Sequence, residues 1–219
     1  MVCVDPHDIP VVAFIDSEMM SSMPKGLTAA TGMDALTHAI EGYITAGAWE
    51  LSDMFHLKAI EIISKSLRGA VANTPEGREG MALGQYVAGM GFSNVGLGIV
   101  HSMARTLGGM FHVAHGLADA ILLPYIIRYN STDAKAKEVY DTFAKKVGAE
   151  NLYEAVEKLN KRLNIPSCLQ EVIPDEVAFV EKLDEMAALA KADGCTKTNP
   201  IIPELEEFKE LFMKAYRGE

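Results

Sequence analysis

The sequence is poor in cysteine and contains no long apolar run. Its three cysteines, Cys3, Cys168 and Cys195, lie far apart and form no CxxC pair. This pattern argues against a disulfide framework or a zinc knuckle and is typical of a reducing cytoplasm. No apolar stretch approaches the roughly 20 residues that a membrane span needs. No early segment combines basic residues, an apolar run and a cleavage site, so we expect no signal peptide.

Basic residues are also scarce. The chain has 20 Lys and Arg residues against 30 Asp and Glu residues, which gives a net charge of −10. Nucleic acids and anionic membrane surfaces need clustered Lys and Arg, so we expect neither as a main partner. With 219 residues and 49% hydrophobic content, the chain is long and apolar enough for a globular protein of one or two domains.

Strand patterns are almost missing. Residues 10–16 (PVVAFID) are β-branched and apolar after a proline, and they form the only convincing strand. One strand cannot form a sheet because its backbone groups need partners. This strand is therefore either a remnant of a larger sheet or pairs with something outside the chain.

Helical periodicity covers the chain from about residue 25. We expect Gly108-Gly109 to end the helix that carries His101, and His115 to open the next one. These two histidines would then come from different elements. Further helices are expected near residues 131–147, 151–163, 175–192 and 203–217, which predicts an all-α fold.

Four residues carry the main functional signal: Asp34, His38, His101 and His115. The spacing of four between Asp34 and His38 places both on one helix face. One carboxylate and three imidazoles form a donor set suited to Fe(II) or Zn(II). His112, three residues before His115, is placed to line the same cavity without ligating.

Each of these residues has an ordinary structural explanation when taken alone. Asp34 and His38 can be a polar pair on a helix face, and His101 can be a hydrogen-bonded core histidine. Their apolar, glycine-rich surroundings favour the metal site. Burying Asp34 without a partner would cost several kcal/mol, and a divalent ion would offset that cost.

Three stretches point to a family: TAATGMDALTHAIEGYIT, GQYVAGMGFSNVGLGIVHSMA and HGLADAILLP. They closely resemble the iron-dependent (group III) alcohol dehydrogenases, whose fold is like that of dehydroquinate synthase. The resemblance covers essentially the whole chain and is most specific between Pro24 and Asn130. Members have an N-terminal α/β domain that binds the nicotinamide dinucleotide and an all-helical, metal-binding C-terminal domain. This chain resembles the second domain at 24–219, preceded at 1–23 by the last strand and linker of the first.

The resemblance also implies a chemistry. It assigns the metal ligands to Asp34, His38, His101 and His115, with Fe(II) as the expected ion and Zn(II) as the alternative. The full enzyme would use NAD or NADP to interconvert small alcohols or diols with aldehydes or ketones. A homodimer is implied by the resemblance alone.

Arg105 departs from the family pattern, which usually has a second histidine four residues after the one matching His101. That histidine is proposed to help in proton transfer. An arginine stays protonated and cannot shuttle a proton at neutral pH. Arg105 therefore either binds an acidic substrate or marks reduced activity, and Arg105 and His112 are the candidate catalytic residues.

The sequence lacks a dinucleotide-binding loop. Gly96-Leu97-Gly98 is followed by residues that break the glycine pattern, and it lies in a helical stretch. Met1 followed directly by a mid-protein segment favours a shortened chain. We therefore expect this chain alone neither to bind NAD tightly nor to turn over alcohol.

Two other functions stay open. One is a non-catalytic helical module for assembly or regulation that lacks the cofactor domain, which Arg105 favours. The other is a metal-dependent hydrolase in which Asp34 and the histidines activate water. Its general base would be Glu41, the only candidate on the same helix stripe.

Overall fold

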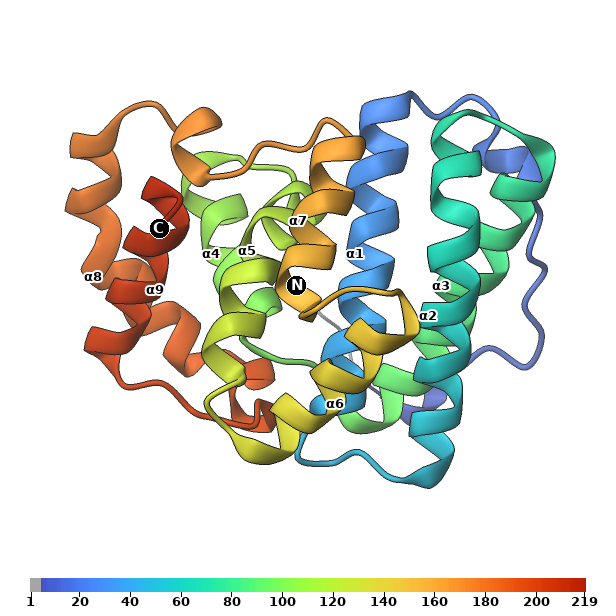
Figure 1. Ribbon diagram of the computed structural model, residues 1–219, viewed down its shortest axis with the longest axis horizontal. Coiled ribbons are helices and arrows are strands. Elements are labelled where there is room, and N and C mark those ends of the chain that lie inside the picture. The colour runs from blue at the N-terminus through green and yellow to red at the C-terminus, as the bar shows by residue number, and fades with distance from the viewer. Residues whose placement is uncertain (1–4) are drawn as a thin grey trace.

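The structure is a computed structural model that describes residues 5–219, and those residues fold almost entirely into helices (Figure 1). They form nine α-helices, four short 3₁₀ helices and no strand. The α-helices are α1 (Lys25–Ile44), α2 (Glu50–Val71), α3 (Pro75–Val95), α4 (Ile99–Phe111), α5 (His115–Asn130), α6 (Ala134–Lys146), α7 (Leu152–Arg162), α8 (Glu176–Ala192) and α9 (Leu205–Arg217). The 3₁₀ helices are η1 (Pro6–Asp8), η2 (Ser17–Met20), η3 (Leu169–Glu171) and η4 (Gly194–Thr198). The expected all-α fold is confirmed.

The helices form two groups that meet at α1. Helices α1, α2 and α3 stand side by side at one end of the molecule, and α8 and α9 lie at the other end (Figure 1). Helix α5 packs against α1, α4 and α7, and α4 in turn packs against α8. One continuous apolar core runs through both groups. This arrangement places the functional residues of α1, α4 and α5 where the two groups join.

Side-chain caps explain why several helices begin where they do. Thr74 precedes Pro75 and accepts a hydrogen bond from the amide of Gly77 at 3.1 Å, which starts α3. Asp133 and Asp175 cap α6 and α8 in the same way. The four helices expected near 131–147, 151–163, 175–192 and 203–217 are all present, as α6 to α9.

The strand expected at 10–16 is wrong as secondary structure. Residues 12–16 adopt no regular structure, and Val11 and Phe14 are almost fully exposed. No other strand exists among the described residues, so the backbone groups of this segment have no ladder to join. The β-branched pattern alone cannot form a strand without a partner.

The predicted end of α4 is also wrong. Helix α4 continues through Gly108 and Gly109 to Phe111, and His112 takes the turn with a left-handed φ of 57°. Glycine costs a helix only about 1 kcal/mol per residue. Burial of the Met103 and Leu107 side chains stabilises the helix and outweighs that cost. His115 does open α5, so the two histidines come from different helices as expected.

Helix α5 contains an internal proline. Pro124 has no amide hydrogen, so the carbonyl of Ala120 loses its helical partner. The side-chain amide of Asn160, on α7, donates to that carbonyl at 2.6 Å. A side chain from a second helix therefore provides the hydrogen bond that the Ala120 carbonyl lacks within α5.

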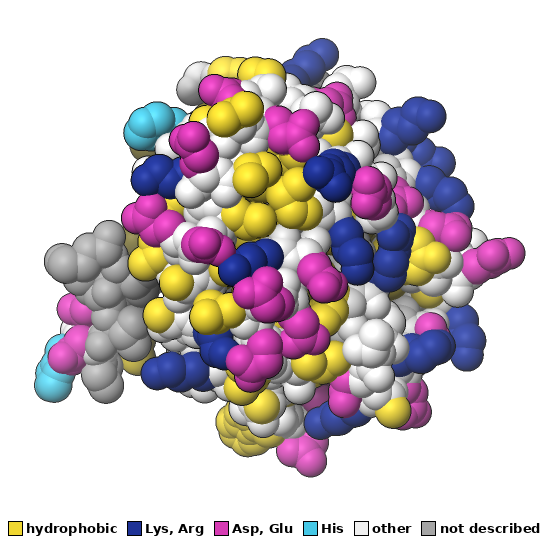
Figure 2. Space-filling model, turned by 90° about the vertical axis from the view of Figure 1, so that its left-hand side faces the viewer, with side chains coloured by type: hydrophobic (Ala, Val, Ile, Leu, Met, Phe, Trp, Pro, Cys, Tyr) yellow, Lys and Arg dark blue, Asp and Glu magenta, His cyan; other side chains and the backbone are white. Residues whose placement is uncertain are grey.

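The face formed by α8 and α9 carries both signs of charge. Figure 2 shows basic side chains interspersed with acidic ones there rather than gathered into a patch. Ion pairs such as Lys182 with Glu185 and Lys209 with Asp184 account for part of this mixture. Within the part of the chain that the structure describes, no helix has the length and apolarity needed to cross a bilayer.

Candidate metal centre

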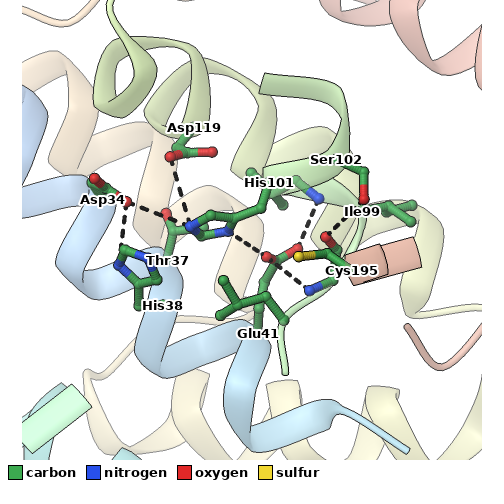
Figure 3. Close-up of polar contacts among 12 residues, drawn as sticks. Asp34, Thr37, His38, Glu41, Ile99, His101, Ser102, Asp119 and Cys195 are labelled. Carbon is green, nitrogen blue, oxygen red and sulfur yellow. Dashed lines mark hydrogen bonds and ion pairs between the residues drawn. The ribbon is translucent and has the colours of Figure 1, made fainter. Parts of the chain in front are cut away.

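Three of the four predicted donors, Asp34, His101 and His115, converge where α1, α4 and α5 meet, whereas His38 lies beside this group and is not one of its donors. Asp34 and His38 lie one turn apart on α1, and the Nδ1 of His38 is 3.2 Å from the Oδ1 of Asp34. The Nε2 of His101 approaches the same carboxylate oxygen at 3.5 Å (Figure 3). The ring of His101 lies 4.4 Å from that of His38 and 5.3 Å from that of His115, between centroids. Three separate helices therefore bring the Asp34 carboxylate and the imidazoles of His101 and His115 together, with the ring of His38 next to Asp34 and His101.

Asp119 is a fifth polar group at this point, and the sequence pattern did not single it out. It lies one turn after His115 on α5, and its Oδ2 is 3.2 Å from the Nε2 of His115 and 4.0 Å from that of His101. Asp34, His101, His115 and Asp119 each offer one donor atom within 4.8 Å of the others. The spacing of four between His115 and Asp119 repeats that of Asp34 and His38, and this signal was present in the sequence.

Several donor atoms of the cluster are buried without a hydrogen-bond partner. They are the Oδ1 of Asp34, the Nε2 of His101 and both carboxylate oxygens of Asp119. Buried polar groups without partners are rare because each costs free energy. A divalent cation would satisfy these atoms together, so the donor set fits such an ion in both chemistry and position.

Burial and neighbouring charges together shift the pKa values of the cluster. Burial lowers the pKa of His101, but the carboxylates of Asp119, Asp34 and Glu41 outweigh burial and raise it to about 10. Burial, together with the charge of His101, lowers the pKa of His38 to about 3. Burial raises the pKa of Asp119 well above its usual range. The carboxylates around His101 therefore favour positive charge at the centre of the cluster.

Glu41 fixes the orientation of His101. Its buried carboxylate accepts hydrogen bonds from the backbone amides of Gly98 at 3.0 Å and Val100 at 2.7 Å. It also lies 2.6 Å from the Nδ1 of His101, which leaves the Nε2 of that ring facing the other donors (Figure 3). With both oxygens engaged, Glu41 is not placed as the general base of a hydrolase.

The absence of a side chain at Gly98 makes this contact possible. A Cβ at this position would lie 2.6 Å from Oε1 of Glu41 and 2.7 Å from Oδ1 of Asn199. Asn199 completes the site by accepting from the amide of Ile99 at 3.3 Å and pairing with the side chain of Asn130. The first turn of α4 is thus held by side chains from two distant segments, and Asn130 positions one of them, Asn199.

Arg105 lies one turn after His101 but points to a different partner. Its Nη1 donates to both carboxylate oxygens of Asp193, at 2.9 Å and 2.8 Å. Cys195 lies two residues after Asp193. Burial raises the pKa of its thiol to about 11, so the deprotonated thiolate that binds metals is disfavoured. His112 is exposed at the end of α4 and is not among the grouped donors. The catalytic roles of Arg105 and His112 stay predictions.

A cavity of about 370 Å³ adjoins the α1 side of the cluster. Asp34 and His38 line it together with Phe92, Arg78 and apolar side chains of η2 and α3. The ring of Phe92 stacks on His38 with centroids 4.3 Å apart. The cluster therefore borders a space lined mainly by apolar groups, which favours the binding of a small organic molecule.

Comparison with known proteins gives consistent matches. The model of the Fe-containing alcohol dehydrogenase family, C-terminal, matches residues 28–216. A lactaldehyde reductase of Escherichia coli (strain K12) is 51% identical over 98% of this chain and 58% of its own length. An NADPH-dependent butanol dehydrogenase of Clostridium saccharobutylicum is 41% identical over 95% of this chain and 56% of its own length.

Solved structures extend the similarity to the fold. An iron-containing alcohol dehydrogenase from Thermococcus thioreducens superposes with a TM-score of 0.93 and 35% identity, covering 98% of this chain and 57% of that one. A 1,3-propanediol oxidoreductase gives a TM-score of 0.84 at 36% identity, over 92% of this chain and 55% of its own. The chain thus spans a little over half the length of the relatives it matches.

Proposed function

This chain belongs to the Fe-containing alcohol dehydrogenase family, and from that membership we propose that it is the metal-binding helical part of such an enzyme. The proposed ligands are Asp34, His38, His101 and His115, with Fe(II) as the resident ion and Zn(II) as the alternative. The observation that carries the proposal is the group of buried, unpartnered donor atoms where α1, α4 and α5 meet.

The proposed reaction is the NAD(P)-dependent interconversion of a small alcohol or diol with an aldehyde or ketone, as in a lactaldehyde reductase. A bound divalent ion supplies Lewis-acid polarisation of the substrate oxygen. The chain's own contribution is geometric. Glu41 orients His101, the ring of Phe92 stacks on His38, and the cavity beside them offers space for a small substrate next to Asp34 and His38.

The dinucleotide is proposed to bind to an N-terminal domain that corresponds to the part of the relatives this chain does not cover. Residues 1–23 would belong to that domain and its linker, and residues 24–219 would form the metal-binding domain. This division makes the isolated chain inactive and unable to hold NAD tightly. Saturation-transfer NMR with NAD tests it, and tight binding to the isolated chain would contradict it.

The test of the metal assignment is elemental analysis of protein purified without oxygen. We expect close to one equivalent of iron or zinc per chain. Alcohol oxidation is then measured after fusing the chain to the N-terminal domain of a relative such as the Escherichia coli lactaldehyde reductase. A chain that takes up no divalent metal would overturn the proposal.

The second candidate function, a non-catalytic assembly or regulatory module, is favoured by the pair of Arg105 with Asp193. Arg105 already pairs with the carboxylate of Asp193, so its guanidinium is not free to bind an acidic substrate. Bound metal without alcohol oxidation in the fused enzyme would support the module. In that enzyme, Arg105→His is the informative variant, and a gain in turnover shows that Arg105 limits proton transfer.

A small alcohol or aldehyde substrate, assembly as a homodimer and a cytoplasmic location complete the proposal.

A further inference from the structure

We propose that Asp119 is a fifth protein donor to the metal ion, so that the centre holds two carboxylates and three imidazoles. The proposal rests on the metal centre proposed above and extends it to a residue outside the predicted ligand set. Asp119 lies on α5, one turn after His115, and its side chain points toward His101 from the side opposite Glu41 (Figure 3).

The distances fit shared coordination. Two donors about 2.1 Å from one octahedral ion lie about 3.0 Å apart when they are adjacent and about 4.2 Å apart when they face each other. The Oδ2 of Asp119 is 3.2 Å from the Nε2 of His115 and 4.0 Å from the Nε2 of His101. The separation of 3.5 Å between Asp34 and His101, both predicted ligands, lies in the same range. Asp119 is therefore as well placed as a predicted ligand.

Burial separates Asp119 from an ordinary helix-surface pair. A surface pair of residues four apart keeps both groups in water. The side chain of Asp119 is fully buried, and neither of its oxygens has a hydrogen-bond partner. No lysine or arginine lies in ion-pair contact with it among residues 5–219. A cation between Asp119, Asp34 and the imidazoles would supply both the missing partner for the carboxylate oxygens and the missing positive charge.

A second carboxylate changes the preference of the centre. Two carboxylates neutralise a divalent ion that a single carboxylate would leave with a net charge near +1. Five protein donors exceed the four that zinc usually takes and leave one position of an octahedral ion free for a substrate oxygen. Asp119 therefore favours iron, or another ion that accepts six ligands, over zinc.

The test uses Co(II), Fe(II) and Zn(II) themselves as probes. The whole chain and its Asp119→Asn variant are freed of metal by chelation and titrated with each ion without oxygen. We expect the variant to bind Co(II) and Fe(II) about 10- to 100-fold more weakly and to lose less affinity for Zn(II). The visible absorption of Co(II) should also intensify in the variant, because fewer ligands give stronger d–d bands.

Asp53→Asn is the control, because it also removes a carboxylate with a buried, unpartnered oxygen, from a half-buried residue on α2 that lies outside the donor group. It should bind all three ions as the parent does. If Asp119→Asn fails to fold, X-ray absorption of the Co(II)-loaded parent still decides the question, since a five-donor centre predicts two carboxylates besides three imidazoles.

The outcomes separate the two proposals. Affinities and spectra unchanged by Asp119→Asn, with metal lost in His101→Ala, would overturn the role of Asp119 and leave the proposed function standing. A parent chain that binds none of the three ions would instead remove the proposed metal centre.

Discussion

His101 on α4 and His56 on α2 are both fully buried, but their surroundings differ. His101 faces carboxylate oxygens of Asp34, Glu41 and Asp119. His56, on α2, has no hydrogen-bond partner at either ring nitrogen. Its ring fits between two glycines, and a Cβ at either Gly42 or Gly91 would overlap its Nε2.

The contrast separates burial from electrostatics. Burial alone lowers the pKa of His56 to about 4 and keeps its ring neutral. Burial lowers the pKa of His101 as well, but three carboxylates reverse the result and raise it to about 10. A buried histidine therefore indicates a cation site only when acidic groups from other helices surround it.

The largest expected effect is on metal uptake. His101→Ala removes a ring that faces Asp34 and Asp119 and should abolish stoichiometric binding, as should His115→Ala. Metal is measured by elemental analysis and folding by helical circular dichroism, which should remain largely intact. His56→Ala is the matched control, because it removes an equally buried imidazole and should leave metal content unchanged. Full metal content in both His101→Ala and His115→Ala would refute the assignment.

The next effect is on the pH dependence of stability. His56 has a lower pKa in the folded chain, about 4, than in the unfolded chain, about 6.5, so the unfolded state takes up the proton first. Its contribution to stability is complete above pH 6.5 and is lost as the pH falls towards 4. The free energy of unfolding should fall by about 3 kcal/mol as a result.

Urea unfolding of the metal-free parent and of His56→Leu, measured from about pH 7 to about pH 4, tests this expectation. The variant should lose less stability than the parent over that range. His7→Leu, which removes an exposed imidazole, controls for the loss of a histidine elsewhere. Parallel pH profiles for the parent and His56→Leu would show that burial of His56 does not exclude its charge.

A smaller effect is expected at Glu41, which acts through His101. Glu41→Gln keeps the size of the side chain but removes the charge that orients the Nδ1 of the ring. We expect metal affinity to fall about 10- to 100-fold, as for other groups that orient a ligand. Glu61→Gln, at an exposed position on α2, is the control and should bind metal normally. Equal affinity in both variants would contradict the positioning role.

The smallest effect concerns the space around His56. Gly91→Ala would force a Cβ against the ring and should lower the free energy of unfolding by roughly 1 to 3 kcal/mol. Gly89→Ala, on the same helix and with no atom within 4 Å of the place a Cβ would take, should instead be neutral or stabilising. Urea denaturation measures both. Equal stability of the two variants would show that the ring of His56 moves aside without cost.

The sequence predicted local features well. Helix starts carry their signal in one or two residues, as Asp133 and Asp175 show, and those helices appear where expected. The spacing of four between Asp34 and His38 placed both on one helix face. The prediction that Gly108-Gly109 ends α4 was wrong because the low helix propensity of glycine costs little free energy, and burial of neighbouring side chains outweighs it.

The sequence could not predict long-range partners. Glu41 accepts from the backbone of Gly98 and Val100, more than 50 positions later in the chain, and nothing around Glu41 announces that contact. The depth of Asp119 likewise depends on how α5 packs against α1 and α4. A spacing rule can nominate a residue for a helix face, but only the packing of several helices decides what that face meets.

Pro124 and Asn160 have a consequence for motion. A proline inside a helix usually creates a hinge, and this one lies five residues after Asp119 on α5. The hydrogen bond from Asn160 to the carbonyl of Ala120 connects this part of α5 to α7. Bending α5 to release His115 and Asp119 would require α7 to detach as well. Amide hydrogen exchange in α5 and α7 should therefore slow or quicken together, although α7 contributes no side chain to the donor group.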